Sequence, residues 1–177
     1  MMSSSNKSNT SLWNSLISNL EDSVSPGLPQ GLSRYENASV GFVENELASS
    51  LTDDQRTILD SVQKYRITIV ESANSLGKTW ISARAALWFL RCHVDAQVYM
   101  AAAPPEYNLR NLLWGELDAS LINASPAVLD GLTRRALSLA YGPRWWCKGL
   151  TIPTTGTPEQ RQARFAGKHS PFLLFIL

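Results

Sequence analysis

The sequence contains little of what a metal site, a disulfide framework or a membrane span requires. Only two of its 177 residues are cysteine and two are histidine, and Cys92 and Cys147 have neither the spacing of zinc ligands nor the density of a disulfide-bonded domain. The longest apolar run, 80–90, is interrupted by a serine and an arginine and is shorter than the roughly 18 residues of a membrane helix. The first residues lack the apolar core of a signal peptide. These shortages predict a protein of a reducing, cytoplasmic setting with no membrane partner.

Acidic residues are scarce near the C-terminus. From residue 131 onward Glu159 is the one acid beside seven basic residues, whereas the first 60 residues carry eight acids and three bases. The net charge of the whole chain is only +1, so it gives no global argument for a nucleic acid partner. The distribution instead predicts a basic surface in the last quarter of the chain.

That basic stretch contains two adjacent tryptophans, Trp145 and Trp146, between Arg144 and Lys148. Aromatic rings interleaved with basic residues can stack on exposed nucleotides. Such a pair is more often one buried face of a strand and its rim, which is the interpretation we favour, and the basic stretch can equally be a solvated surface. Any contact to DNA would be to phosphates and independent of base sequence.

The remaining composition, 44% hydrophobic and 18% charged, is that of a globular protein. We expect 1–50 to be a flexible N-terminal segment with a short helix at 11–22, and 51–177 to form one domain. Its expected elements are a helix that begins after Thr52 in a capping box with Gln55, strands at 67–70, 96–103 and 172–177, and helices at 78–92 and 106–122. This alternation predicts an α/β fold with a parallel sheet flanked by helices and right-handed crossovers.

A phosphate-binding loop is the strongest chemical motif of the sequence. The pattern G-x-x-x-x-G-K-[ST] is matched except at its first glycine. Gly77 would let the backbone approach a phosphate, Lys78 would reach the β- and γ-phosphate oxygens, and Thr79 would coordinate Mg²⁺. The simpler interpretation is an ordinary strand-to-helix turn with a solvated lysine. The expected nucleotide-binding residues are Ser72, Ala73, Asn74, Ser75, Leu76, Gly77, Lys78 and Thr79.

Two further features surround this loop. Gln55 lies on the helix before it and resembles the glutamine that reads the adenine edge in helicase-like ATPases, although a glutamine on a helix is usually only solvated. After the second expected strand comes the turn 102–105 (AAPP) and a helix that contains LLWGE. Together with the Trp/Ala-rich helix after G-K-T, these features resemble the large terminase subunit of tailed bacteriophages, from about Leu51 to the C-terminus.

The resemblance implies a P-loop NTPase fold with ATP and Mg²⁺ as cofactors. The chain would be the ATP-binding part of a motor that couples ATP hydrolysis to translocation of double-stranded DNA. The implied partners are double-stranded DNA, the small terminase subunit, the portal protein and further copies of the chain in a homo-oligomeric ring. The implied location is the cytoplasm of a bacterial host, as a phage or prophage protein.

The sequence departs from the terminase pattern within the phosphate loop. Some relatives carry there an arginine that stabilises the transition state, and Asn74 occupies the corresponding place. The sequence does not choose among the substitutes it offers, which are Arg84, Arg110, Arg134 and Arg135.

A second departure concerns the Walker B acids. The apolar strand expected at 172–177 is followed by no Asp or Glu to hold magnesium and activate water. We therefore expect an N-terminal fragment of a terminase with an incomplete ATPase core, no assigned catalytic residue, no nuclease domain and hydrolysis near background. In this class of ATPase a sheet strand also comes from later sequence, so we expect marginal stability and exposed apolar edges.

Two other functions remain open from the sequence. A small-molecule or nucleoside kinase also uses a phosphate loop, but usually begins closer to it and keeps the first glycine that Ser72 replaces. A non-catalytic remnant or interaction module is the third interpretation. Phosphorylation of a small acceptor would favour the kinase, and DNA-stimulated hydrolysis by a longer chain would favour the motor.

Overall fold

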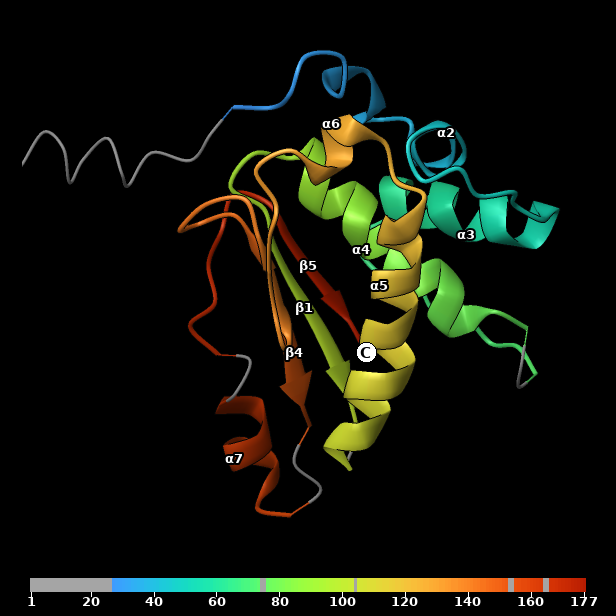
Figure 1. The fold of residues 1–177 in the computed structure, drawn as a ribbon. Helices are drawn as coiled ribbons and strands as arrows, with labels where there is room; N and C mark the ends of the chain where they lie inside the picture. Colours follow the sequence, from blue (N-terminus) through green and yellow to red (C-terminus); the bar gives the residue numbers. More distant parts are fainter. Residues whose placement is uncertain (1–26, 74–75, 104, 153–154, 164–165) are drawn as a thin grey trace, which may run out of the picture.

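A mostly parallel five-stranded sheet flanked by helices forms the centre of the molecule (Figure 1). The computed structural model describes residues 27–177 except 74–75, 104, 153–154 and 164–165. The strands are β1 (Gln97–Ala102), β2 (Thr133–Arg135), β3 (Ser138–Ala140), β4 (Trp146–Thr151) and β5 (Leu173–Ile176). Their order is β2-β3-β4-β1-β5, with β4, β1 and β5 parallel and the β2–β3 hairpin antiparallel at the edge of β4. The expected α/β class is confirmed, and so are the strands expected at 96–103 and 172–177.

The central strand β1 gives the sheet two different faces. Its pairing places Val98 beside Cys147 on one face, and Tyr99 beside Lys148 and Phe175 on the other. Val98 and Cys147 belong to the main hydrophobic core that the sheet shares with its helices. Because side chains alternate along a strand, Tyr99 and Lys148 stand on the opposite, outer face.

The long helix after the candidate phosphate loop packs on the core face. This helix, α4 (Lys78–Cys92), has the bounds that the sequence predicted. Its alanines and leucines, among them Leu87 and Leu90, are buried and hold it against β1. The small alanine side chains let this helix approach the sheet closely.

The helix before the loop begins as predicted. It is α3 (Asp53–Lys64), and Thr52 and Gln55 form the capping box at its start. The Thr52 hydroxyl accepts from the Gln55 backbone N–H at 3.3 Å, and Gln55 Oε1 accepts from the Thr52 backbone N–H at 3.1 Å. Two backbone donors that the helix leaves without partners are thus satisfied.

The helix expected at 106–122 is also present, but its middle is wound differently. A π-helical segment, η2 (Asn108–Leu113), runs directly into α5 (Trp114–Ile122). Leu109, Leu112 and Leu117 follow α-helical spacing, yet only Leu109 and Leu117 of these three are buried, and Leu112 is 53% exposed. A π-helical turn holds more residues than an α-helical one, so the apolar positions rotate away from the face that α-helical spacing predicts.

The strand expected at 67–70 is not formed, which corrects the sequence analysis. Ile67, Thr68, Ile69 and Val70 lie in no helix or strand, and Ile67 and Ile69 are 76% and 84% exposed. A strand requires a neighbour to accept its backbone hydrogen bonds. In the described part of the chain β5 is the edge of the sheet, and no further strand lies beyond it to pair with 67–70.

Residues 27–50 belong to the folded unit rather than to a flexible segment. They contain a short 3₁₀ helix, η1 (Ser33–Tyr35), and the helix α2 (Ser39–Asn45). Phe42 and Val43 are fully buried, and Trp88 Nε1 of α4 donates to the Tyr35 carbonyl at 2.7 Å. The apolar residues of this segment therefore complete the core on top of α4. Residues 1–26, including the helix expected at 11–22, lie outside the described residues.

Two short helices complete the structure, α6 (Pro126–Leu129) and α7 (Pro158–Ala163). Figure 1 shows α7 on the side of the sheet opposite α5. Trp145 is fully buried and Trp146 is 9% exposed, which confirms the buried interpretation of the tryptophan pair. Within the described ranges, no helix has the length and hydropathy to cross a membrane.

Candidate phosphate-binding site

Gly77 forms the junction between the candidate phosphate loop and α4. Its φ of 81° lies in the left-handed region, and it is the N-cap residue of the helix. A Cβ at this position would also lie 3.1 Å from Gln55 Nε2. Glycine is therefore needed here chiefly for its backbone conformation. The same contact shows that Gln55 lies beside the loop, so the fold brings these two predicted site residues together.

The ammonium group of Lys78 is turned back onto the start of the loop. Its Nζ donates to the carbonyl oxygens of Ser72 and Ala73, both at 2.8 Å, and to Ser72 Oγ at 3.1 Å. The three donors of the ammonium are thus matched by three loop oxygens. Oxygens of Ser72 and Ala73 thus surround one positive charge, and an anionic ligand could take their place. Asn74 and Ser75 lie outside the described residues.

The first turn of α4 offers backbone donors to the same place. Gly77 has no side chain to cap the helix, and the first intrahelical bond runs from the Ile81 N–H to the Gly77 carbonyl. The amides of the first turn therefore lack intrahelical acceptors. Together with the helix dipole, they favour a negative charge at this end of a helix of 15 residues.

A groove of about 540 Å³ lies next to this helix end. One wall is the start of α4, with Lys78 and Thr79, and the other is formed by η2 and α5. The second wall contributes two polar side chains, Asn111 and Glu116. Neither of them had an expected role in the sequence. A spacing of five residues is not one face of a regular α-helix, so only the packed structure, with the π-helical segment η2, shows that both line the groove.

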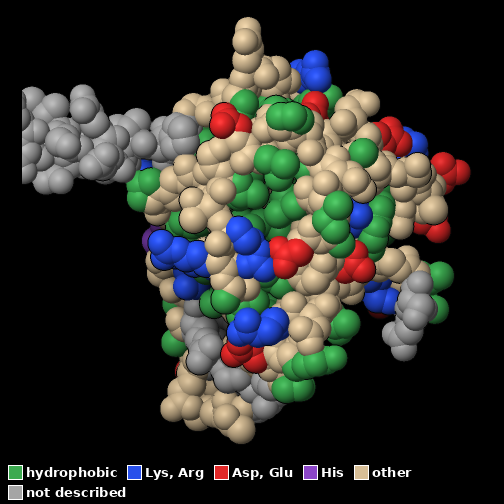
Figure 2. Space-filling model, viewed as in Figure 1, with side chains coloured by type: hydrophobic (Ala, Val, Ile, Leu, Met, Phe, Trp, Pro, Cys, Tyr) green, Lys and Arg blue, Asp and Glu red, His purple; other side chains and the backbone are tan. Residues whose placement is uncertain are grey.

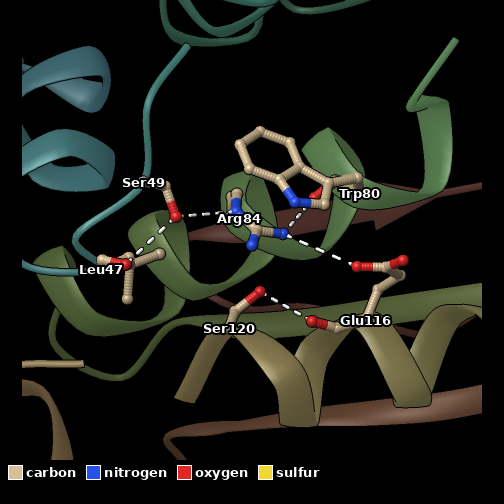
Figure 3. Close-up of polar contacts among 6 residues, drawn as sticks. All are labelled: Leu47, Ser49, Trp80, Arg84, Glu116 and Ser120. Atoms are coloured by element: carbon tan, nitrogen blue, oxygen red, sulfur yellow. Dashed lines mark hydrogen bonds and ion pairs between the residues drawn. The ribbon is translucent and has the colours of Figure 1, made fainter. Parts of the chain in front are cut away.

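Arg84 lies beneath the groove in a network of polar contacts (Figure 3). Its Nε donates to Ser49 Oγ at 3.1 Å, and its Nη1 donates to the Trp80 carbonyl at 3.0 Å and lies 3.8 Å from Glu116 Oε2. The guanidinium also stacks on the Trp80 ring at 3.4 Å. Burial lowers the pKa of Arg84 to about 10, and the charge of Glu116 opposes that shift.

The other arginines that could replace the missing loop arginine lie in different places. Arg110 pairs with Glu106 at 2.9 Å, and Arg134 pairs with Asp118 at 2.6 Å. Arg135 lies with Arg134 on strand β2. Arg84 contacts two residues that line the groove, Trp80 and Glu116.

Within the described residues, no group of three or more His, Cys, Asp or Glu side chains is arranged to hold a metal ion. The comparisons with known proteins add no relative: no protein-family model matches this chain, and no curated protein is significantly similar to it.

Proposed function

We propose that residues 72–79 bind the phosphates of ATP, in a chain that is the ATP-binding part of a DNA-packaging motor of the terminase type. The observation that carries the proposal is the contact between Lys78 and residues 72–73 at the N-terminal end of α4. There Gly77 has the left-handed conformation and the Lys78 ammonium is held by the oxygens of Ser72 and Ala73. This arrangement gathers a positive charge and backbone amides without intrahelical acceptors in one place.

Phosphate oxygens would replace the loop oxygens around Lys78. An ammonium that donates to neutral carbonyls gains from exchanging them for charged oxygens, because charge-assisted hydrogen bonds are stronger. Thr79, half-buried in the groove wall, would place its hydroxyl on Mg²⁺. The magnesium ion would neutralise charge on the β- and γ-phosphates.

The nucleoside part of the proposal rests on Gln55. Its Oε1 is engaged by the capping box, and its Nε2 is directed at Gly77. A primary amide next to the loop can present a donor and an acceptor to the adenine edge.

The motor activity rests on the resemblance alone. The small terminase subunit, the portal protein and the homo-oligomeric ring are proposed on the order of the glutamine, the G-K-T tripeptide and the AAPP turn along the chain. Double-stranded DNA is the proposed substrate of the complete motor.

Titration calorimetry with Mg·ATP tests the phosphate site. Lys78→Ala removes a charge-assisted contact of on the order of 1.5–3 kcal/mol, so we expect affinity to fall roughly ten- to hundred-fold. Lys64→Ala, at the exposed end of α3, is the matched control and should leave affinity unchanged. Equal affinity in the wild-type chain and Lys78→Ala would contradict the proposal.

A further inference from the structure

A row of polar and basic side chains crosses the sheet on its outer face. Arg135 of β2 is paired with Ser138 of β3, Ser138 with Lys148 of β4, and Lys148 with Tyr99 of β1. Residues that are paired across neighbouring strands point to the same face. Strands lie about 4.8 Å apart, so the backbones at Arg135 and Lys148 are separated by roughly 10 Å. The row therefore presents one cation on each side of the Ser138 hydroxyl.

The cations of this row are not neutralised by acids. In the described part of the chain neither Arg135 nor Lys148 forms an ion pair, whereas the adjacent Arg134 makes a two-pronged contact with Asp118 at 2.6 Å. Lys148 Nζ lies 3.9 Å from the centre of the Trp146 ring. The Trp146 ring thus holds the Lys148 ammonium group in place, and the charge remains available to an anion.

A third cation extends the row over β1. Lys168, in the segment before β5, has its Nζ 4.6 Å from the centre of the Tyr99 ring. Tyr99 and Trp146 pack edge to face at 5.0 Å. Two ammonium groups are therefore held on one pair of packed rings, and Arg135 continues the positive surface on the other side.

The surface is hollowed where the hairpin meets β4. A groove of about 340 Å³ is lined by Arg135, Lys148, Ser138 and Thr133, and none of the described residues that line it is acidic. On the face displayed in Figure 2, Lys and Arg side chains lie left of the centre, and some of them have Asp or Glu side chains beside them. The groove combines charged and hydroxyl donors, which is what phosphate oxygens require.

We propose that this outer basic row, Arg135, Ser138, Lys148 and Lys168, binds the phosphate backbone of double-stranded DNA. Trp146 is 9% exposed and Tyr99 7%, so neither ring is free to stack on the bases of a single strand. Among the described residues that line the groove, none is a large exposed hydrophobic side chain that could anchor a protein partner, and Pro143 is the one exposed apolar residue there. What remains is charge and hydrogen bonding, which suits a duplex backbone read without sequence preference.

The proposal shares DNA as a partner with the proposed function but depends on other residues. The row stands on the outer face of the sheet, and the phosphate loop lies at the end of α4, which packs on the core face. Lys78→Ala should therefore leave DNA binding intact, and changes in the row should leave ATP binding intact. The two proposals can fail separately.

Fluorescence anisotropy of the 177-residue chain with a labelled random-sequence duplex, over a series of salt concentrations, tests the row. Each phosphate contact contributes about 0.9 to the slope of log affinity against log salt. The double variant Arg135→Ala/Lys148→Ala should bind more weakly, with a slope smaller by about 1.8. The pair Arg135→Gln/Lys148→Gln repeats the test with longer side chains, and circular dichroism confirms that each variant is folded.

Arg134→Ala is the matched control, because Arg134 precedes Arg135 on the same strand and is paired with Asp118. It should change the slope little. An unchanged slope in both double variants, or an equal change in Arg134→Ala, would overturn the proposal. Tighter binding of a single strand than of the duplex would also overturn it, as would displacement of the duplex by polyglutamate at equal charge concentration.

Discussion

Gln55 has two positions of interest in the structure, one in the capping box of α3 and one beside Gly77. Gln55 satisfies the capping box of α3 through its Oε1 and approaches Gly77 with its Nε2. The start of α3 and the residues before α4 therefore lie next to each other at this amide. A side chain at residue 77 would meet only the flexible end of Gln55, so the left-handed backbone of Gly77 is the stronger reason for glycine.

Nucleotide preference tests Gln55. If its amide recognises adenine, Gln55→Ala should reduce the ratio of ATP to GTP affinity while the affinity for triphosphate remains largely intact, because the contacts at Lys78 are unchanged. Competition titrations with both nucleotides measure this ratio. Gln63→Ala is the control on the same helix, since Gln63 bonds to Ser39 and Asn37 away from the loop. An unchanged ratio would leave Gln55 as a capping residue only.

At the scale of elements, Arg84 joins three parts of the chain. It belongs to α4, donates to Ser49 in the connection between α2 and α3, and faces Glu116 of α5. Ser49 Oγ in turn donates to the Leu47 carbonyl at 3.1 Å, and Ser120 Oγ donates to the Glu116 carbonyl at 2.7 Å (Figure 3). The Arg84 guanidinium can contact Ser49 and Glu116 at the same time because it is planar and carries five donors.

Urea unfolding of single variants should show how much Arg84 and Glu116 each contribute to the free energy of unfolding. Arg84→Ala removes buried hydrogen bonds from a charged group and the packing on Trp80, so we expect a loss of about 1.5–3 kcal/mol. Glu116 is 38% exposed and 3.8 Å from Arg84, so Glu116→Ala should cost less than about 1 kcal/mol. Equal losses would mean that the ion pair, rather than the hydrogen bonds and ring contact of Arg84, holds the elements together.

At the scale of the whole molecule, one edge of the sheet and one apolar segment have no strand paired with them among the described residues. The outer edge of β5 pairs with no described strand, and Ile67 and Ile69 of the segment 67–70 are largely exposed. Unpaired strand edges and exposed β-branched residues favour association between copies of a chain. The stability of the monomer gains little from these side chains because they contact little.

Light scattering at increasing protein concentration tests this consequence. Ile67→Thr/Ile69→Thr should reduce association with little change in Tm, since both side chains are already exposed in the monomer. Ile122→Thr is the control, an isoleucine of similar exposure, 78%, at the end of α5. Association that is unchanged in the double variant, or reduced equally in the control, would contradict this assignment.

The sequence by itself determined the elements whose stability is local. The capping box at Thr52, the bounds of α4 and the strands β1 and β5 follow from hydrogen-bonding side chains and apolar runs within a few residues of each other. The loop residues 76–79 could be recognised for the same reason, because the pattern of glycine, lysine and threonine is itself local. The extent of the helix after β1 was predicted, but the π-helical winding that exposes Leu112 was not.

Tertiary structure decided what depends on distant neighbours. The segment 67–70 has the composition of a strand, yet it forms none because strand pairing is a property of two segments and its partner is not among the described ones. The composition of residues 27–50 suggested a flexible segment. These residues nevertheless fold, because α4 offers an apolar surface for them to cover. The groove wall with Asn111 and Glu116, and the row from Arg135 to Lys148, exist only once helices pack and strands align. Those contacts join residues far apart in sequence, and no local pattern encodes them.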